Sequence, residues 1–330
     1  MWTRALTSLT LLAALTGAPS AEARHPRLRK PARGFQMRMG EFTIPPGGER
    51  EVCEPRVTPN KQPIDVSGFD LRMPAGSHHF VLWEYLGNDT NPDHFPQGIV
   101  NSVGCIGVGP PGAFSVNGDL FGMQTARARL RFPRGIAVRL EANARVFLNA
   151  HIRNFSAIEP LTPEIVFNVR RARKGTVKHR AQNLIVGNSL DINIPAHSGA
   201  SLTSDWFAPA DLNVVQLSTH QHKRGTHTLV RHIDAGGNDL GQLFEANDWE
   251  HPGEKWFVRP TFRLRKGEGL RFTCEWNNPD DHVVRYGVTT NDEMCFVAGY
   301  FYPDDESVPV RGPGCIPQGA GILCFGRKVP

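Results

Sequence analysis

The sequence predicts an all-β fold of antiparallel strands, arranged as a β-sandwich or a jelly roll. Short segments alternate between apolar and polar residues, which is typical of strands with one buried and one wet face. Clusters of turn-forming residues separate these segments, and no amphipathic pattern extends over four helical turns. The 33 Gly and 26 Pro among 330 residues also disfavour long helices, because both residue types interrupt them.

The alternation is clearest in two neighbouring segments. In residues 126–132 (ARARLRF) every second residue is apolar, and Ile136, Val138 and Leu140 would share one face of the next strand. Similar but weaker patterns occupy residues 164–169, 191–194 and 261–264. Turns are predicted between strands at 46–48 (PGG), 117–119 (NGD), 236–238 (GGN) and 277–279 (NNP).

Residues 1–23 have the pattern of a secretory signal peptide. Arg4 supplies the positive charge, residues 6–15 are mostly apolar, and the triplet Ala21-Glu22-Ala23 fits cleavage before Arg24. The apolar stretch is too short to span a bilayer, and no later segment reaches about 18 apolar residues. We therefore expect a secreted or periplasmic protein with no transmembrane segment.

The length of the remaining chain favours two sandwich domains over one. A basic stretch of low apolar content at residues 170–178 lies near the middle and marks the predicted boundary. The net charge is +5, and positive charges cluster at Arg24–Arg33 and at Arg170–Lys174, which we interpret as a flexible N-terminus and an exposed turn. The predicted division is a signal peptide at 1–23, a basic N-terminus at 24–34, sandwiches at 35–172 and 173–305, and a tail at 306–330.

Six cysteines in an exported chain predict disulfide bonds. Proximity along the chain favours Cys274–Cys295 and Cys315–Cys324, which leaves Cys53–Cys105. Thiolate metal binding is the alternative, but the chain contains no Cys-x-x-Cys pair.

Two nucleotide-related functions are disfavoured. Residues 107–112 match G-x-G-x-x-G, but two prolines remove the N–H donors that a dinucleotide needs, and no βαβ unit surrounds them. A nucleic-acid partner would need a basic face with stacking aromatic residues, and the sequence shows none. We therefore expect no nucleic-acid partner.

Histidines next to predicted strands are the candidate metal ligands. His220 and His222 form an H-x-H motif after the apolar run 212–217, and residues i and i+2 of a strand share a face. The adjacent His78 and His79 can reach one metal only if the backbone bends there. His151, which follows another apparent strand, is a candidate third ligand. Each of these signals is weak alone, because surface and structural histidines are common.

Met294 is the candidate sulfur ligand. It lies in the sequence DEMC, directly before the aromatic segment 296–302. A methionine here can simply fill a core. A thioether is also a soft ligand that favours Cu(I).

In chain order, these motifs resemble those of the copper type II, ascorbate-dependent monooxygenases. The shared order is HH, a strand histidine, H-x-H, and DEMC before an aromatic strand. The separations are 72 residues from His79 to His151, 69 from His151 to His220, and 72 from His222 to Met294. The resemblance spans nearly the whole chain after the signal peptide, about residues 45–303.

The resemblance implies two copper ions, one on each sandwich, facing each other across a solvent-filled cleft. It also implies that Cys274–Cys295 is a family disulfide beside Met294, and that Cys53–Cys105 resembles another near the first copper. The implied ligands are His78, His79 and His151 for the electron-donating copper, and His220, His222 and Met294 for the copper where O₂ and substrate react.

The implied reaction is hydroxylation of an aliphatic or benzylic C–H bond of a small molecule or peptide. One oxygen atom comes from O₂, and the electrons come from ascorbate or a similar reductant. Two one-electron metals can store the two electrons without flavin or haem. A site of three imidazoles can cycle between Cu(I) and Cu(II), whereas the methionine site favours Cu(I).

Several positions depart from the peptidylglycine-hydroxylating members of the family. Those enzymes bind the substrate carboxylate with an Arg two residues before H-x-H, where this chain has Ser218. They use an Asn and a Tyr two and four residues after the ligand Met, where this chain has Phe296 and Ala298. We therefore expect an apolar pocket at these three positions and a substrate other than a glycine-extended peptide. Tyr85 stands where the animal enzymes have a cysteine.

Two other functions remain open. An exported copper-binding protein without catalytic activity would use the same ligands, and the missing substrate clamp is consistent with it. A secreted β-sandwich that binds a glycan or a protein would be indifferent to copper. The oligomeric state is open as well, and the sequons at Asn88 and Asn154 have meaning only if the host glycosylates.

Overall fold

The computed structural model describes residues 28–85, 95–101, 117–287, 289–303, 315–318 and 321–329. All regular elements in these ranges are β-strands, which confirms the predicted all-β class. In the same ranges there is no helix with the length and apolar character needed to cross a bilayer. Cys105, Asn88 and the glycine-rich residues 107–112 lie outside the described residues.

The described strands up to residue 171 belong to the predicted first sandwich. They are β1 (Gly34–Arg38), β2 (Glu49–Val57), β3 (Ile64–Arg72), β4 (Ser77–Tyr85), β5 (Val100–Asn101), β6 (Asn117–Met123), β7 (Arg127–Arg131), β8 (Ile136–Leu140), β9 (Arg145–Arg153) and β10 (Val166–Arg171).

The later strands belong to the predicted second sandwich and the predicted tail. They are β11 (His179–Gly187), β12 (Asn193–Ile194), β13 (Ser198–Phe207), β14 (Leu212–His220), β15 (Gly225–Ile233), β16 (Asp239–Ala246), β17 (Lys255–Trp256), β18 (Phe262–Leu264), β19 (Gly269–Asn278), β20 (Val284–Arg285), β21 (Phe296–Pro303), β22 (Cys315–Gln318), β23 (Gly321–Phe325) and β24 (Arg327–Lys328).

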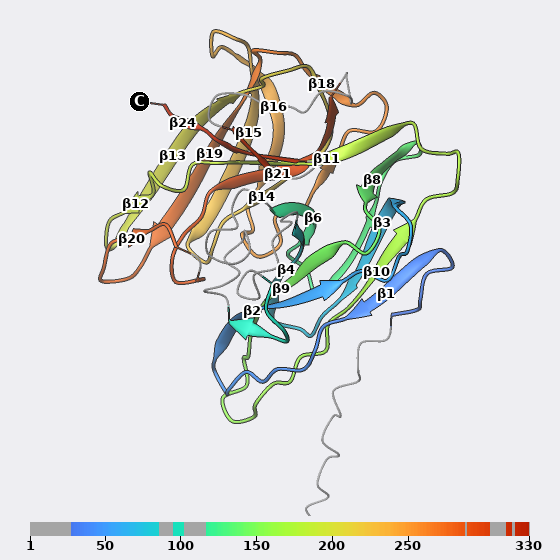
Figure 1. The fold of residues 1–330 in the computed structure, drawn as a ribbon. Coiled ribbons are helices and arrows are strands. Elements are labelled where there is room, and N and C mark those ends of the chain that lie inside the picture. The colour runs from blue at the N-terminus through green and yellow to red at the C-terminus, as the bar shows by residue number, and fades with distance from the viewer. Residues whose placement is uncertain are drawn as a thin grey trace, which may run out of the picture.

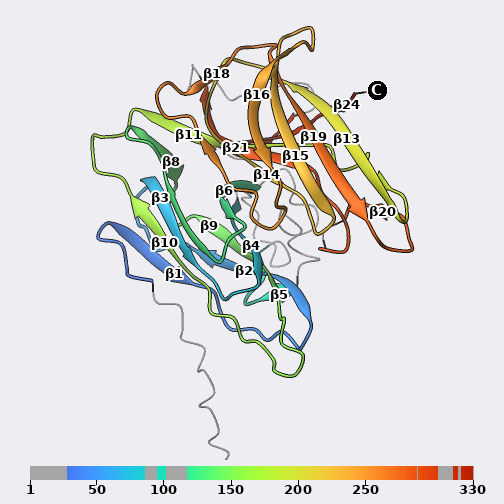
Figure 2. The same ribbon diagram turned by 180° about the vertical axis from the view of Figure 1, so that it is seen from behind.

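One long sheet runs through both halves of the molecule (Figures 1 and 2). Its main path is β1-β10-β3-β8-β11-β21-β14-β17. A five-stranded sheet, β5-β2-β9-β4-β6, packs on the first half, and another, β16-β15-β19-β13-β24, packs on the second. The two halves therefore share a sheet, although each has its own second layer.

Two hydrophobic cores lie between these layers. In the first core, Phe69 of the long sheet stacks on Phe121 of the facing sheet with ring centroids 4.6 Å apart. In the second, Leu184 of the long sheet belongs to the same cluster as Phe272 of the facing sheet. The alternation read from the sequence produces these cores, as in β7, where exposed and buried residues alternate strictly.

The predicted domain boundary falls in the turn between β10 and β11, but the sheet continues across it. β8 and β11 pair in parallel, with His179 opposite Ile136. Tyr300 of the second half packs in the first core, and its hydroxyl donates a hydrogen bond to the Leu120 carbonyl at 3.1 Å. The division into two jelly-roll domains stays a prediction.

Three expectations differ from the structure. Residues 117–119, predicted as a turn, lie in β6, because pairing with β4 imposes an extended backbone on them. Residues 28–33, predicted as part of a flexible N-terminus, pack on the sheet. The carbonyls of Leu28 and Arg29 accept hydrogen bonds from the Gln36 and Asn168 amides. The predicted tail adds strands to both layers, since β23 pairs with β11 and β24 pairs with β13.

The sequon residue Asn154 has a structural role. Its side chain is buried, and the amide nitrogen donates to the carbonyls of Ile44, Pro45 and Glu159 at 3.2, 3.1 and 2.8 Å. An amide occupied in this way holds its loop together. We therefore do not expect a glycan on Asn154.

One predicted disulfide is present. Cys274 and Cys295 are bonded, which joins β19 to the start of β21. Cys53 and Cys324 are also disulfide-bonded, and the pairing of β22 with β23 places Cys315 opposite Cys324. The two pairs Cys53–Cys105 and Cys315–Cys324 stay predictions, because they involve cysteines whose side chains are not described.

Gly299→Ala should destabilise the protein by separating β14 from β21. A Cβ atom at Gly299 would lie 2.1 Å from the backbone oxygen of Gln216, which cannot move independently of its strand. We expect a loss of about 2 kcal/mol in the free energy of unfolding, measured by chemical denaturation. Gly199→Ala is the control, because a Cβ there meets its nearest neighbour at an ordinary 3.5 Å. Equal effects of the two changes would contradict this prediction.

Candidate metal centre

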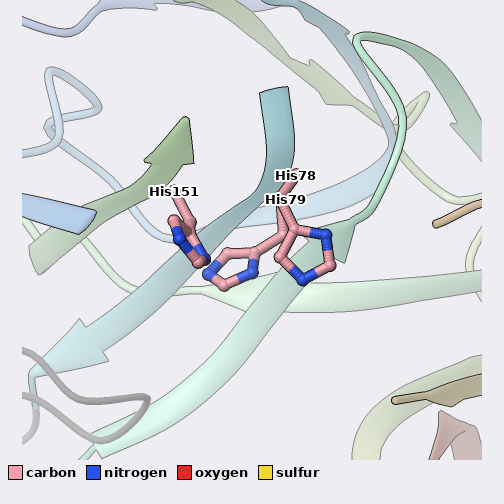
Figure 3. A group of neighbouring side chains, drawn as sticks. All are labelled: His78, His79 and His151. Atoms are coloured by element: carbon pink, nitrogen blue, oxygen red, sulfur yellow. The ribbon is translucent and has the colours of Figure 1, made fainter. Parts of the chain in front are cut away.

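The histidine pair lies in a β-bulge, which supplies the predicted bend. Where β4 pairs with β9, Ser77 is opposite Ile152 and His79 is opposite His151, so His78 is the extra residue. The bulge brings two consecutive side chains together. The His78 ring lies 5.1 Å from that of His79 and 5.2 Å from that of His151 (Figure 3).

A row of polar side chains crosses β4, β9 and β2 beside this pair. His79 is opposite His151, which is opposite Glu51. The Nε2 of His79 lies 3.2 Å from Oδ1 of Asn149, whose amide nitrogen donates to Glu51 at 3.0 Å. Burial alone would raise the pKa of Glu51, but the hydrogen bond and charge of His79 lower it below its usual value. Asn149 holds the Nε2 of His79 and leaves Nδ1 available to a metal.

Glu49 links this row to the second half of the chain. Its Oε1 lies 2.5 Å from Nε2 of His151, and the Thr290 hydroxyl donates to both carboxylate oxygens at 2.9 and 2.7 Å. Burial opposes ionisation, but these bonds lower the pKa of Glu49 to about 2. The carboxylate therefore orients His151 and holds the segment that precedes Met294.

The H-x-H pair lies where β14 ends. His220 is the last residue of the strand, opposite Phe296 of β21, and its ring lies 5.1 Å from that of His222. The Nδ1 of His222 lies 3.2 Å from the Asp292 carbonyl, a pure acceptor, so Nδ1 carries the proton. The Nε2 of His222 is left as the nitrogen with a lone pair.

Glu293, which sequence reasoning missed, holds this turn in place. It is fully buried, and its carboxylate accepts hydrogen bonds from the backbone N–H groups of His222 at 3.0 Å and Arg224 at 2.8 Å, and from the Trp276 indole at 2.9 Å. Burial raises the pKa of Glu293 despite these donors. The residue fastens the H-x-H turn to the chain one position before Met294.

Gln124 is a second residue that sequence reasoning missed. Its Oε1 lies 3.0 Å from Nδ1 of His220, and its Nε2 donates to the Trp249 carbonyl at 3.0 Å, which fixes the orientation of the amide. The His220 Nδ1 therefore donates, and its Nε2 keeps the lone pair that can bind a metal. Gln124 follows β6, so the first half of the chain positions a ligand of the second.

The two histidine sets meet in one packed cluster. The His78 ring lies 5.6 Å from that of His220, 5.8 Å from that of His222 and 5.2 Å from that of Trp249. The described side chains thus pack where the family resemblance implies a solvent-filled cleft. Neutral imidazoles tolerate such contact, whereas charged ones would repel each other.

The cluster offers two groups of metal ligands that share His78. In His78, His79 and His151, the candidate ligand atoms lie within 4.8 Å of one another, and the same holds for His78, His220 and His222. A neutral imidazole has one lone-pair nitrogen, so His78 can complete only one group at a time. When His78 serves the first group, the second needs another ligand. The sequence offers Met294 as the candidate; it is half-buried and lies two residues before β21 starts.

The burial of unpaired nitrogens fits a metal. Both ring nitrogens of His78 and Nδ1 of His151 are buried without a hydrogen-bond partner, a costly state that metal coordination relieves. Burial lowers the pKa of His78 and His220 well below the usual range and that of His222 to about 4. The rings are therefore neutral at pH 7, which is the metal-binding form.

The three predicted pocket residues surround His220. Ser218 is opposite Ala298 on the paired strands, and the Phe296 ring lies 6.5 Å from that of His220. The Ser218 hydroxyl donates to the Gly253 carbonyl at 2.6 Å, so it is occupied within the fold. Ile185, opposite Ala298, packs on an aromatic cluster of Trp83, Tyr85 and Phe147.

Four other histidines have ordinary surface partners. His197, His227, His232 and His251 each lie beside a carboxylate, at 2.8, 3.0, 3.1 and 3.3 Å. None of them belongs to a ligand group among the described residues.

Comparison with known proteins supports the resemblance to this family. Residues 182–315 match the sequence profile described as copper type II ascorbate-dependent monooxygenase, C-terminal domain. The predicted resemblance to this family is confirmed over these residues. No curated protein sequence matches the chain.

Solved structures match only weakly. The major capsid protein P2 from bacteriophage PM2 has a TM-score of 0.31 and 11% identity, over 82% of this chain and 98% of that chain. The Sputnik virophage structure has a TM-score of 0.20 and 8% identity, over 89% and 91%. The PBSX exported protein XepA has a TM-score of 0.18 and 8% identity, over 81% and 86%. Scores this low support no conclusion on fold or function.

Acid should destabilise the metal-free protein. Because the folded-state pKa of His222 is about 4, against about 6.5 when unfolded, the unfolded chain binds the proton first as the pH falls. Between pH 7 and pH 5, His222 alone should cost about 2 kcal/mol of the free energy of unfolding, with His78 and His220 acting in the same direction. Chemical denaturation at both pH values measures this. His220→Leu should flatten the pH dependence, whereas His197→Ala, at an exposed position, should leave it unchanged.

Gln124→Leu should weaken copper binding at the His220 group. Without the amide acceptor, the His220 tautomer and ring orientation are no longer fixed, and loss of such a partner typically costs about 10- to 100-fold in metal affinity. Competition with a Cu(I) chelator measures the change. Gln242→Leu, on β16, is the matched control. An equal loss at both histidine groups would indicate general disruption and contradict the assigned role.

Proposed function

We propose that the protein is an exported copper-dependent monooxygenase that hydroxylates an aliphatic or benzylic C–H bond. The observation that carries this proposal is the cluster of five histidines, whose candidate ligand nitrogens form two groups with atoms within 4.8 Å of one another. Both ring nitrogens of His78 and Nδ1 of His151 are buried there without a hydrogen-bond partner. The family match over residues 182–315 supports a monooxygenase-type domain around the second ligand group. Export rests on the signal-peptide pattern of residues 1–23.

Two coppers would supply electrons one at a time and activate O₂. One would be bound by His78, His79 and His151, and the other by His220, His222 and Met294. The overall reaction consumes the substrate C–H bond, O₂, two electrons and two protons, and yields an alcohol and water. Ascorbate or a similar external reductant provides the electrons. The chain's own contribution is to orient the ligands: Glu49 fixes His151, Gln124 fixes His220, and Glu293 holds the backbone of the His222 turn.

The substrate is apolar near the reacting carbon. Ser218, Phe296 and Ala298 carry no charge, and the Ser218 hydroxyl is already bonded within the fold. The Phe296 ring packs directly on Gly187, where an added Cβ atom would lie 2.1 Å from the ring. This contact holds the ring beside His220. These contacts favour a hydrocarbon or aromatic group over the carboxylate of a glycine-extended peptide.

Copper binding without catalysis is the second candidate. The close packing of His78 against His220 and His222 favours it, because no room for a substrate separates these rings. The two candidates differ in what Met294 does. Catalysis needs it, whereas a copper-binding role requires only the histidines.

Copper stoichiometry and O₂ uptake test the proposal together. We expect two coppers per chain and ascorbate-driven O₂ uptake with an apolar substrate panel. His79→Ala and His222→Ala should each lose one copper, and Met294→Ala should abolish uptake while the first copper stays bound. Metal analysis and an oxygen electrode provide the measurements.

Met73→Ala, in the first core, is the matched methionine control and should retain uptake. Two bound coppers without uptake in the reduced wild type would favour the copper-binding candidate. A protein that binds no copper would exclude both.

A further inference from the structure

The outer face of the first half of the long sheet is rich in arginine. On β7, Arg127, Arg129 and Arg131 occupy the exposed alternate positions. Arg72 of β3 is directly opposite Arg127, and Arg170 of β10 lies on the other side of β3. Like charges on neighbouring strands oppose pairing, so this arrangement costs stability.

The N-terminal segment completes this basic face. The carbonyls of Leu28 and Arg29 accept hydrogen bonds from Gln36 of β1 at 2.8 Å and Asn168 of β10 at 2.9 Å. In space, residues 28–33 of the first basic cluster therefore meet Arg170 and Arg171 of the second, and the Arg171 N–H donates to the Arg33 carbonyl at 3.2 Å. They enclose a cavity of about 580 Å³ lined by Leu28, Arg29, Lys30, Ala32, Asp70, Arg72, Arg129 and Arg170.

The single acidic residue of the cavity is already neutralised. Asp70 is 1% exposed, and its carboxylate binds Arg131, Arg170 and Asn168. Burial would raise the pKa of Asp70, but these partners hold it below its usual value. Within the described part of the chain, Arg29, Lys30, Arg72 and Arg129 form no ion pair.

We propose that this face is a docking site for a soluble anionic polymer with repeated phosphate groups. Guanidinium groups bind phosphate oxygens in pairs, and six of the seven cations here are arginines. Alternate residues on a strand are about 7 Å apart, so β7 presents regularly spaced cations to successive anionic groups. The cavity beside β3 would bind one phosphate group of the polymer.

Two other anionic partners fit less well. The exposed large apolar side chains of the described residues lie elsewhere, at Val57, Phe155, Ile158, Leu190, Phe207, Leu240, Val258, Val283 and Tyr286, so the face offers nothing to insert into a membrane. The residues that line the cavity include no aromatic ring on which a base could stack. The site lies on strands that carry none of the metal ligands, so it is independent of the proposed catalysis.

Binding of fluorescent polyphosphate to the full protein tests the proposal. We expect binding that weakens with salt, because phosphate contacts release counterions. Arg129→Ala should lower the slope of log affinity against log salt by about one and weaken binding about tenfold at low salt. Arg72→Ala should act similarly. Unfolding curves should show that both variants remain folded, because the Arg129 side chain is exposed.

Lys266→Ala is the matched control, because it removes an exposed cation from a turn outside the cavity. It should leave polyphosphate binding unchanged. Polyphosphate affinity that is equal in wild type and both arginine variants would overturn the proposal. So would the absence of polyphosphate binding, or a preference for phosphatidylglycerol vesicles or single-stranded DNA over polyphosphate.

Discussion

The structure depends on packing together five imidazoles from both halves of the chain, of which His78, His151 and His222 are buried. A buried imidazole must be neutral and must find a partner for each ring nitrogen. The chain meets this need with partners for the outward nitrogens, such as Asn149 for His79 and Gln124 for His220. His78, with both nitrogens unpaired, is left at the centre of the cluster.

This constraint joins the two halves of the chain. Gln124 from the first half orients a histidine of the second, and Glu49 binds both His151 and Thr290. The shared sheet through β8 and β11 brings the two strand systems close enough for these contacts. Because His78 can give its lone pair to only one group, a second complete site would need a further ligand, and Met294 is the proposed one.

The sequence predicted the class of fold and the histidines that gather in one cluster, because short local patterns reveal both. Period-two alternation identified strands such as β7, and the order of the histidine motifs identified a cluster that the structure assembles. The orienting residues Gln124, Glu49 and Glu293 depend on strand register and on the approach of the two halves, which no local pattern encodes. Pairing of β6 with β4 likewise outweighed the turn propensity of residues 117–119.

X-ray absorption at the copper edge shows directly whether copper binds at this imidazole cluster. For the reduced, copper-loaded protein, we expect imidazole ligands at both coppers and a sulfur ligand at one of them. The sulfur contribution should disappear in Met294→Ala. A spectrum with oxygen ligands and no imidazole would place copper elsewhere on the protein and contradict copper binding at this cluster.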